Sequence, residues 1–339
     1  MLKKSRPIMV LGFLLALAGA WSSQAQTTKP QHLKVAVSTT EPHNLPLWVA
    51  KEKKLFDKYG LDVELVFVSG GTTVAQMLAA GEIQIASAAP AGLTGLIAGG
   101  EKVVMFLGLS NTSPFTLVAQ PTIKKAADLK GKRLGTARFG GSSHVSALIA
   151  MEHLGLDPKR DNITILQTGL DPERVAALEQ KGLDAAMLQR LATKLMVGKG
   201  YTPLLDLYQS KIPYQNNALA AKKDFVTGRP GIGENFTRAV VEAYGYIFNK
   251  EHKQAVKEVV AKTLKLRSVD DAENFYLEAL EGLDKKPYPT LEGTRTVIKY
   301  VAQQNPKVAS LKVEEMIDSS WLRNLESEGF FDKVYGGKQ

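Results

Sequence analysis

The chain has 339 residues, of which 44% are hydrophobic and 23% are charged, and it contains no cysteine. A single hydrophobic core stops growing near ~250–300 residues, so this length predicts more than one lobe. The lack of cysteine excludes disulfides, thiolate metal sites, cysteine nucleophiles and a lipid-anchored N-terminal cysteine. The net charge of +9 is spread over separated lysine pairs without interleaved aromatic residues, which argues against a nucleic-acid partner.

Residues 1–25 have the pattern of a secretory leader. Three basic residues precede an apolar run over residues 8–21, and Ser23 and Ala25 have the small side chains that a cleavage site requires. The apolar run is too short for a good membrane span. We therefore expect a soluble periplasmic protein that is cleaved after Ala25 and carries no lipid anchor.

Strand and helix patterns alternate along the next part of the chain. The expected strands are 33–38, 61–68, 83–89 and 102–110, and the expected helices are 45–60, 72–81 and 90–100. Short links between alternating strands and helices predict an α/β lobe with a largely parallel sheet.

The same alternation then starts again. The expected strands are 132–138, 163–168 and 184–189, and the expected helices are 143–154 and 172–182. Residues 74–90 align without a gap on residues 175–191, because both contain a helix, a glycine, an acidic residue and an apolar strand in that order. This internal repeat predicts two similar lobes rather than one large sheet.

Two extended segments without helical period, residues 114–121 and 216–225, are expected to cross between the lobes. The remaining chain is strongly helical from about residue 227 and is expected to pack on the first lobe. The expected domains are the leader at 1–25, lobe one at 26–118, lobe two at 119–218, and a return segment with C-terminal helices of lobe one at 219–339.

A family resemblance rests on four stretches, residues 35–66, 70–90, 127–156 and 174–188. Together they resemble the ABC-transporter substrate-binding proteins of the sulfonate, taurine, nitrate and thiamine-pyrimidine group. The resemblance implies a two-lobed periplasmic binding protein fold of type II, with two hinge crossings and extra C-terminal helices on lobe one. It also implies a monomer without a cofactor that delivers a small solute to an inner-membrane permease driven by a cytoplasmic ATPase.

Small polar residues and glycines follow the expected strands in both lobes. Ligands of α/β sheets bind beyond the carboxyl ends of the strands, where helix N-termini offer free N–H groups to an anionic or strongly polar solute. The candidate ligand-binding residues are therefore Thr39, Thr40, Asn44, Gly70, Gly71, Thr72, Ser87, Ala88, Asn111, Arg138, Gly140, Gly141, Ser142, Ser143, His144, Gln189 and Arg190.

Three of these candidates, Arg138, His144 and Arg190, would supply positive charge for a sulfonate or carboxylate. Each arginine also fits a solvated surface position, and Ser143 fits the N-cap of its helix. Glu41 argues against a purely anionic pocket if its side chain points inward.

The ligand class stays open because the sequence departs from its relatives. Residues 38–44 lack the aromatic residue expected in the thiamine-pyrimidine branch, and residues 187–191 lack the proline-containing turn of many relatives. The first expectation is a sulfonate-like, taurine-like or carboxylate solute. The alternatives are a neutral or aromatic solute such as a thiamine pyrimidine precursor, and a binding module that feeds a membrane sensor.

Enzymatic interpretations fit the sequence poorly. Adjacent Ser143 and His144 at a helix start do not face each other as a nucleophile and base must. His144 and His153 are nine residues apart, about half a turn out of phase on a helix, and no H-E-x-x-H spacing occurs. We therefore expect a binding protein without catalytic residues or a metal site.

Overall fold

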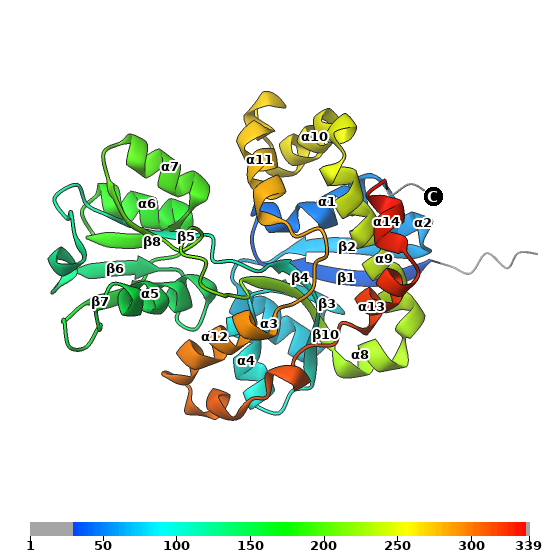
Figure 1. The fold of residues 1–339 in the computed structure, drawn as a ribbon, viewed down its shortest axis with the longest axis horizontal. Helices are drawn as coiled ribbons and strands as arrows, with labels where there is room; N and C mark the ends of the chain where they lie inside the picture. Colours follow the sequence, from blue (N-terminus) through cyan, green and yellow to red (C-terminus); the bar gives the residue numbers. More distant parts are fainter. Residues whose placement is uncertain (1–29, 337–339) are drawn as a thin grey trace, which may run out of the picture.

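The computed structural model describes residues 30–336, which form two lobes around two five-stranded sheets (Figure 1). The predicted leader at residues 1–25 lies outside the described residues. The first sheet has the order β2-β1-β3-β10-β4. Its strands are β1 (Gln31–Val37), β2 (Leu61–Phe67), β3 (Ile85–Ala88), β4 (Val103–Ser110) and β10 (Asn217–Lys222).

The second sheet repeats the first position by position, with the order β7-β6-β8-β5-β9. Its strands are β5 (Phe115–Ala119), β6 (Arg133–Thr136), β7 (Thr164–Gln167), β8 (Ala185–Gln189) and β9 (Thr202–Asp206). In each sheet three parallel strands are followed by one antiparallel neighbour, β10 beside β3 and β5 beside β8. The predicted repeat is thus seen in the topology, because β3 and β8 hold the same position.

Helices follow the strands of both lobes. The expected helix over 45–60 is interrupted at Lys54, which has a left-handed φ of 55°. The helices are α1 (Leu45–Glu52), α2 (Leu55–Lys58), α3 (Gly71–Ala80), α4 (Pro90–Ala98), α5 (Ser142–His153), α6 (Asp171–Glu179), α7 (Arg190–Gly198), α8 (Lys223–Gly228), α9 (Pro230–Phe248), α10 (Lys253–Leu264), α11 (Glu273–Gly282), α12 (Leu291–Ala302), α13 (Ser320–Ser327) and α14 (Phe330–Val334).

The chain crosses between the lobes over residues 111–114 and 207–216. The two segments expected to cross instead form β5, which pairs with β8 and β9, and β10, which pairs with β3 and β4. The predicted boundary after residue 118 therefore falls inside a strand of the second sheet. An extended segment looks the same in sequence whether it links two sheets or joins one, so its sheet is decided by pairing.

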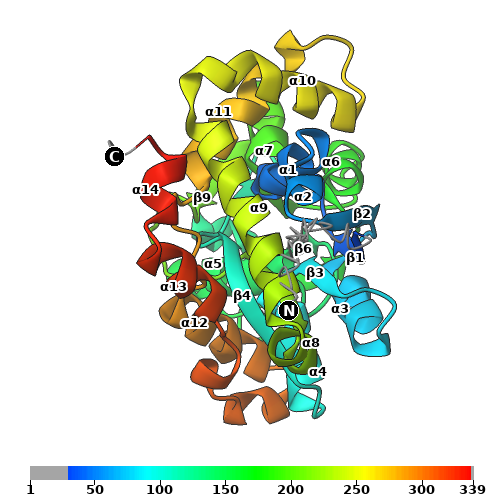
Figure 2. The same cartoon turned by 90° about the vertical axis from the view of Figure 1, so that its right-hand side faces the viewer.

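The C-terminal helices cover the first lobe, and α12 also packs against a helix of the second lobe. Helix α9 packs against α1, and α13 and α14 lie beside it (Figure 2). Helix α12 contacts both α4 of the first lobe and α5 of the second. The helices were expected on lobe one, and α12 extends this arrangement by joining the two lobes on one side.

Aromatic stacking organises the core of the first lobe. Phe56 stacks on Phe236 with ring centroids 5.1 Å apart, and Trp48, which is 6% exposed, stacks on Phe275 at 5.6 Å. Trp48 therefore belongs to the core, where its large apolar surface is removed from water. Within residues 30–336, no helix has both the length and the apolar character that a membrane crossing needs.

Candidate functional site

A cavity of about 180 Å³ lies between the two lobes and is lined by both. The first lobe contributes Ser38, Thr39, His43, Ser69, Gly70, Gly71, Thr72, Ala89 and Gly92, together with Asn216 and Asn217 from the second crossing and β10. The second lobe contributes Phe115, Ala137, Arg138, Gly141, Ser142, Ser143, Gly169, Leu170, Glu173, Arg174 and Gln189.

Among the helices that begin at this cavity are α3 and α4 from the first lobe and α5 and α6 from the second. None of the four has a side-chain hydrogen bond at its N-cap. Helix starts carry a partial positive charge on their unpaired backbone N–H groups. Their convergence therefore favours a ligand with negative charge or strong hydrogen-bond acceptors.

Arg174 is the most deeply buried charged residue of the cavity wall, with 1% of its surface exposed. Its Nη1 donates to the carbonyl oxygen of Gly169 over 2.8 Å, and its Nη2 forms an ion pair with Asp171. The buried Nε has no hydrogen-bond partner among the described residues. A buried donor without a partner costs free energy, so an acceptor on a bound ligand would stabilise this arrangement.

Arg138 closes one side of the cavity from its exposed position on the second lobe. Its Nη1 donates to Thr73 Oγ1 of the first lobe over 3.3 Å. The side chain also lies beside Gly70, where an added Cβ would stand 3.4 Å from Arg138 Nε. Gly70 has φ +92°, a conformation that other residues rarely adopt, so glycine is required both by the backbone and by this close approach.

A buried polar network supports the cavity floor. Ser87 Oγ lies 2.7 Å from Asn44 Oδ1 and 3.0 Å from Asn217 Oδ1, and Asn44 Nδ2 donates to the carbonyl oxygen of Thr39 over 2.9 Å. Asn44 and Ser87 are 0% exposed. They hold the lining residues Thr39 and Asn217 in place from below rather than facing a ligand.

Burial shifts the pKa values of three titratable groups near the cavity floor, His43, Glu41 and Glu278. It lowers the pKa of His43 to about 4, so the imidazole that lines the cavity is neutral at pH 7. A second cavity of about 40 Å³ adjoins the first at His43 and Gln189 and contains Glu41 and Glu278. Burial raises the pKa of Glu41 to about 8, with repulsion from Asp171 and Glu278 adding to the shift and Arg174 opposing it. Burial also raises the pKa of Glu278 to about 7, although the positive charge of Arg190 acts to lower it.

About half of the candidates taken from sequence line the cavity. These are Thr39, Gly70, Gly71, Thr72, Arg138, Gly141, Ser142, Ser143 and Gln189. The other candidates lie outside its wall: Thr40, Asn44, Ser87, Ala88, Asn111, Gly140, His144 and Arg190.

Three of the candidates outside the wall have partners elsewhere. Asn111 Nδ2 donates to Asp284 Oδ2 over 2.8 Å. His144 is buried, its Nε2 lies 2.9 Å from Gln304 Nε2, and burial lowers its pKa to about 4. Arg190 pairs with two glutamates of α11, which are described below.

Ser143 lines the cavity but does not cap α5. The N-cap of this helix is Gly141, and Ser143 Oγ accepts a hydrogen bond from the Ala137 N–H over 2.8 Å. The serine therefore fixes the turn between β6 and α5, and the predicted N-cap role was wrong because the helix starts one residue earlier than Ser143.

Sequence reasoning missed Arg174, a cavity-lining residue whose buried Nε has no hydrogen-bond partner within residues 30–336. The repeat contained a usable signal, since Arg174 aligns with Thr73, which lies in the first turn of α3 beside the cavity residue Thr72. The pair Asn216 and Asn217 was missed because the second crossing carries no helix start. Among residues 30–336, no group of three histidine, aspartate or glutamate side chains is placed to hold a metal ion.

Comparison with known proteins identifies a family and several relatives of this chain. A family model described as NMT1/THI5 like matches residues 41–254. A binding protein of Brucella abortus is 27% identical over 230 residues, which cover 67% of this chain and 61% of that protein, so the match spans less than two thirds of its length. An ABC transporter periplasmic binding protein of Brachyspira hyodysenteriae is 27% identical over 231 residues, covering 63% of this chain and 64% of that protein.

A solved structure shows the same fold at lower sequence identity. The periplasmic aliphatic sulphonate binding protein SsuA of Escherichia coli superposes with a TM-score of 0.67 at 17% identity, covering 85% of this chain and 92% of that chain. The two-lobed architecture is thus that of the periplasmic binding protein fold, as the sequence predicted, whereas the crossings lie at other residues than the predicted ones.

Proposed function

Because this chain belongs to the NMT1/THI5-like family, we propose that it is the solute-binding component of an ABC importer. In this proposal a small anionic organic solute, such as a sulfonate or carboxylate, binds in the cavity between the lobes. The loaded protein then presents the solute to an inner-membrane permease driven by a cytoplasmic ATPase. The leader predicted from sequence and the relative named as an ABC transporter periplasmic binding protein support the location and the partner.

The unpartnered Nε of buried Arg174 is the observation that carries the ligand class. A sulfonate or carboxylate oxygen would accept this hydrogen bond, and charge-assisted bonds of this kind are about twice as strong as neutral ones. The four helix starts around the cavity add partial positive charge from both lobes. The anion therefore interacts with both lobes at once, which favours closure around it.

The cavity volume supports a small solute. At about 180 Å³ it is below the ~300–1,000 Å³ of pockets that hold drug-sized ligands. Hydroxyl and amide groups of Thr39, Ser142, Asn216 and Gln189 surround the space and would orient polar atoms of the ligand.

A neutral solute, such as a pyrimidine, is the second candidate. Asp171 already compensates the charge of Arg174, so a neutral ligand would leave no unpaired charge. Phe115 lines the cavity and offers an apolar surface to a ring. In this case Arg174 Nε would donate to a ring nitrogen or a carbonyl oxygen of the ligand.

The test is a thermal-stability screen of the purified chain from residue 26 to 339, with alkanesulfonates, taurine, carboxylates, nitrate and pyrimidines as separate additions. A ligand that binds the folded state raises the unfolding temperature by an amount set by its concentration relative to Kd. We expect a sulfonate or a carboxylate to give the largest shift, confirmed by calorimetry. A shift with pyrimidines alone supports the second candidate, and no shift with any addition contradicts the receptor function.

A further inference from the structure

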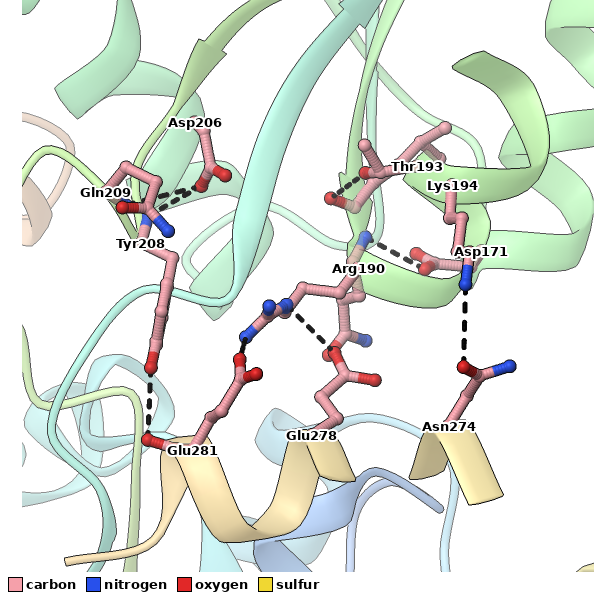
Figure 3. A network of polar contacts seen from close by, with 12 residues as sticks. Asp171, Arg190, Thr193, Lys194, Asp206, Tyr208, Gln209, Asn274, Glu278 and Glu281 are labelled. Atoms are coloured by element: carbon pink, nitrogen blue, oxygen red, sulfur yellow. Dashed lines mark hydrogen bonds and ion pairs between the residues drawn. The ribbon is translucent and has the colours of Figure 1, made fainter. Parts of the chain in front are cut away.

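Arg190, at the start of α7 in the second lobe, reaches across to α11 of the first lobe (Figure 3). Its Nη1 lies 2.7 Å from Glu281 Oε2, and its Nε lies 3.6 Å from Glu278 Oε1. The guanidinium also stacks over the ring of Tyr208, 4.8 Å from its centroid. The same arginine thus contacts the second lobe's crossing segment and two carboxylates of the first lobe.

Two further contacts follow the same path between the lobes. Tyr208 Oη donates to the carbonyl oxygen of Glu281 over 3.0 Å, and Lys194 Nζ lies 3.4 Å from Asn274 Oδ1 (Figure 3). The Lys194–Asn274 contact spans an open groove of about 690 Å³ between α7 and α11. Side chains therefore connect the lobes here across a space that would widen if they separated.

The Arg190 contact with α11 is linked to the ligand cavity through the neighbouring residue Gln189. Gln189, which directly precedes Arg190, lines the cavity, and its N–H donates to Asp171 Oδ2 over 3.0 Å. Asp171 in turn holds Arg174. The start of α7 is thus bonded on one side to Asp171, the ion-pair partner of Arg174 in the cavity wall, and on the other side to α11 of the first lobe.

We propose that Arg190 is a positioning residue that sets ligand affinity by holding the lobes in this arrangement, without touching the ligand. The proposal rests on the proposed function only in its second part, since the position of the lobes is defined with or without a solute. When the binding-competent arrangement is only a fraction of the population, the apparent Kd equals the intrinsic Kd divided by that fraction. A contact that raises the fraction therefore tightens binding from a distance.

The expected loss of ligand affinity on removing the guanidinium depends on how exposed the paired side chains are to solvent. The Arg190 side chain is 33% exposed and that of Glu281 is 55% exposed, so solvent screens their attraction. The Glu278 side chain is 14% exposed and would lose its nearest cation. We expect removal of the guanidinium to weaken binding about three- to tenfold.

The chain offers a matched control in Arg238 of α9. This arginine pairs with Glu234 and Glu328 and stacks over the Phe330 ring at 4.9 Å, so it makes the same kinds of contact as Arg190, but within a single lobe. Arg238→Gln removes two ion pairs and one stacking contact without separating the lobes. Arg190→Gln removes the same kinds of contact between them.

The experiment measures the lobe separation directly. Because the chain contains no cysteine, cysteines introduced at exposed Gln180 and Gln254 can be spin-labelled selectively, one on each lobe. In ligand-free protein, Arg190→Gln should move the label–label distance distribution to longer values, Arg190→Lys should restore part of it, and Arg238→Gln should leave it unchanged. An Arg190→Gln distribution equal to that of the parent protein would overturn the proposal.

A second arm tests the link to affinity with methanesulfonate as the probe, measured by calorimetry. Arg190→Gln should raise its Kd about three- to tenfold, while Arg238→Gln leaves the Kd unchanged. If the distance shifts but methanesulfonate binds none of the variants, including the parent, the sulfonate part of the proposed ligand class is wrong and the lobe contact stands. If the distance shifts and the Kd stays constant, the affinity role is wrong.

Discussion

Asp171 and Arg174, three residues apart in the first turns of α6, form an ion pair whose carboxylate also accepts the Gln189 N–H over 3.0 Å. This pair fixes the guanidinium in the cavity wall, and the buried Nε has no hydrogen-bond partner among the described residues. The cavity wall therefore contains an ordered guanidinium whose charge is balanced by a carboxylate of the protein. Such preorganisation lowers the cost of binding, because the side chain is already ordered before the ligand arrives.

Arg174→Gln should abolish most ligand binding. Hydrogen bonds to charged groups contribute about 1.5–3 kcal/mol, so we expect a loss of about ten- to a hundredfold in affinity by calorimetry. Since Arg174→Gln leaves Asp171 without its cation, the double variant Asp171→Asn/Arg174→Gln separates folding from binding. Arg160→Gln, an exposed arginine of the same lobe, is the control and should bind normally. Normal binding by a folded Arg174→Gln protein would exclude a ligand contact at this residue.

Gly70→Ala should destabilise the protein and disturb the mouth of the cavity. The backbone there has φ +92°, and a methyl group would meet the Arg138 side chain at 3.4 Å. We expect a loss of about 1 kcal/mol in the free energy of unfolding, measured by urea titration. Gly231→Ala is the control, because Gly231 lies outside the left-handed region and an added Cβ would contact nothing within 4 Å. Equal stability of the two variants would contradict this reasoning.

Ser87→Ala should lower stability from beneath the cavity. The hydroxyl is buried and lies within hydrogen-bond distance of Asn44 and Asn217, so its removal leaves buried amide groups with fewer partners. An unsatisfied buried polar group costs about 1–3 kcal/mol. The variant's unfolding temperature should therefore fall clearly below that of Ser310→Ala, an exposed serine. A value within error of this control would argue against the network.

Stability should decline as pH rises from about 6.5 to 8. The pKa values of Glu41, about 8, and Glu278, about 7, lie above the ordinary value of 4.5, so the folded chain binds more protons than the unfolded chain in this window. Ionisation of these carboxyls on raising the pH therefore favours unfolding. The buried His43 and His144, with pKa values of about 4, have the opposite effect, but only below about pH 6.5.

Glu41→Gln and Glu278→Gln test this pH dependence. Each substitution removes one proton-binding site, so the unfolding temperature should change less between pH 6.5 and 8 than in the parent protein. Glu314→Gln, an exposed glutamate, should keep the parent profile. Parallel profiles for all four proteins would show that neither buried carboxyl titrates in this window.

The repeat made most of the architecture predictable. Residues 74–90 and 175–191 have the same order of helix, glycine and apolar strand, and β3 and β8 occupy the same place in their sheets. Because parallel strands end at one edge, the polar segments that follow them had to meet near a cleft. Nine candidate residues reached the cavity by this reasoning, including Thr72 and Ser142.

Local pattern by itself determined the lobes, their alternating elements and the polar helix starts, because these depend on neighbours within a few residues. Only the tertiary structure decided the roles of individual charges. Arg174 and Arg190 both occur in the first turns of helices, yet one is buried in the cavity wall and the other pairs with the opposite lobe. The difference arises from which surface faces each helix start, and that depends on contacts as distant in sequence as Arg190 and Glu281.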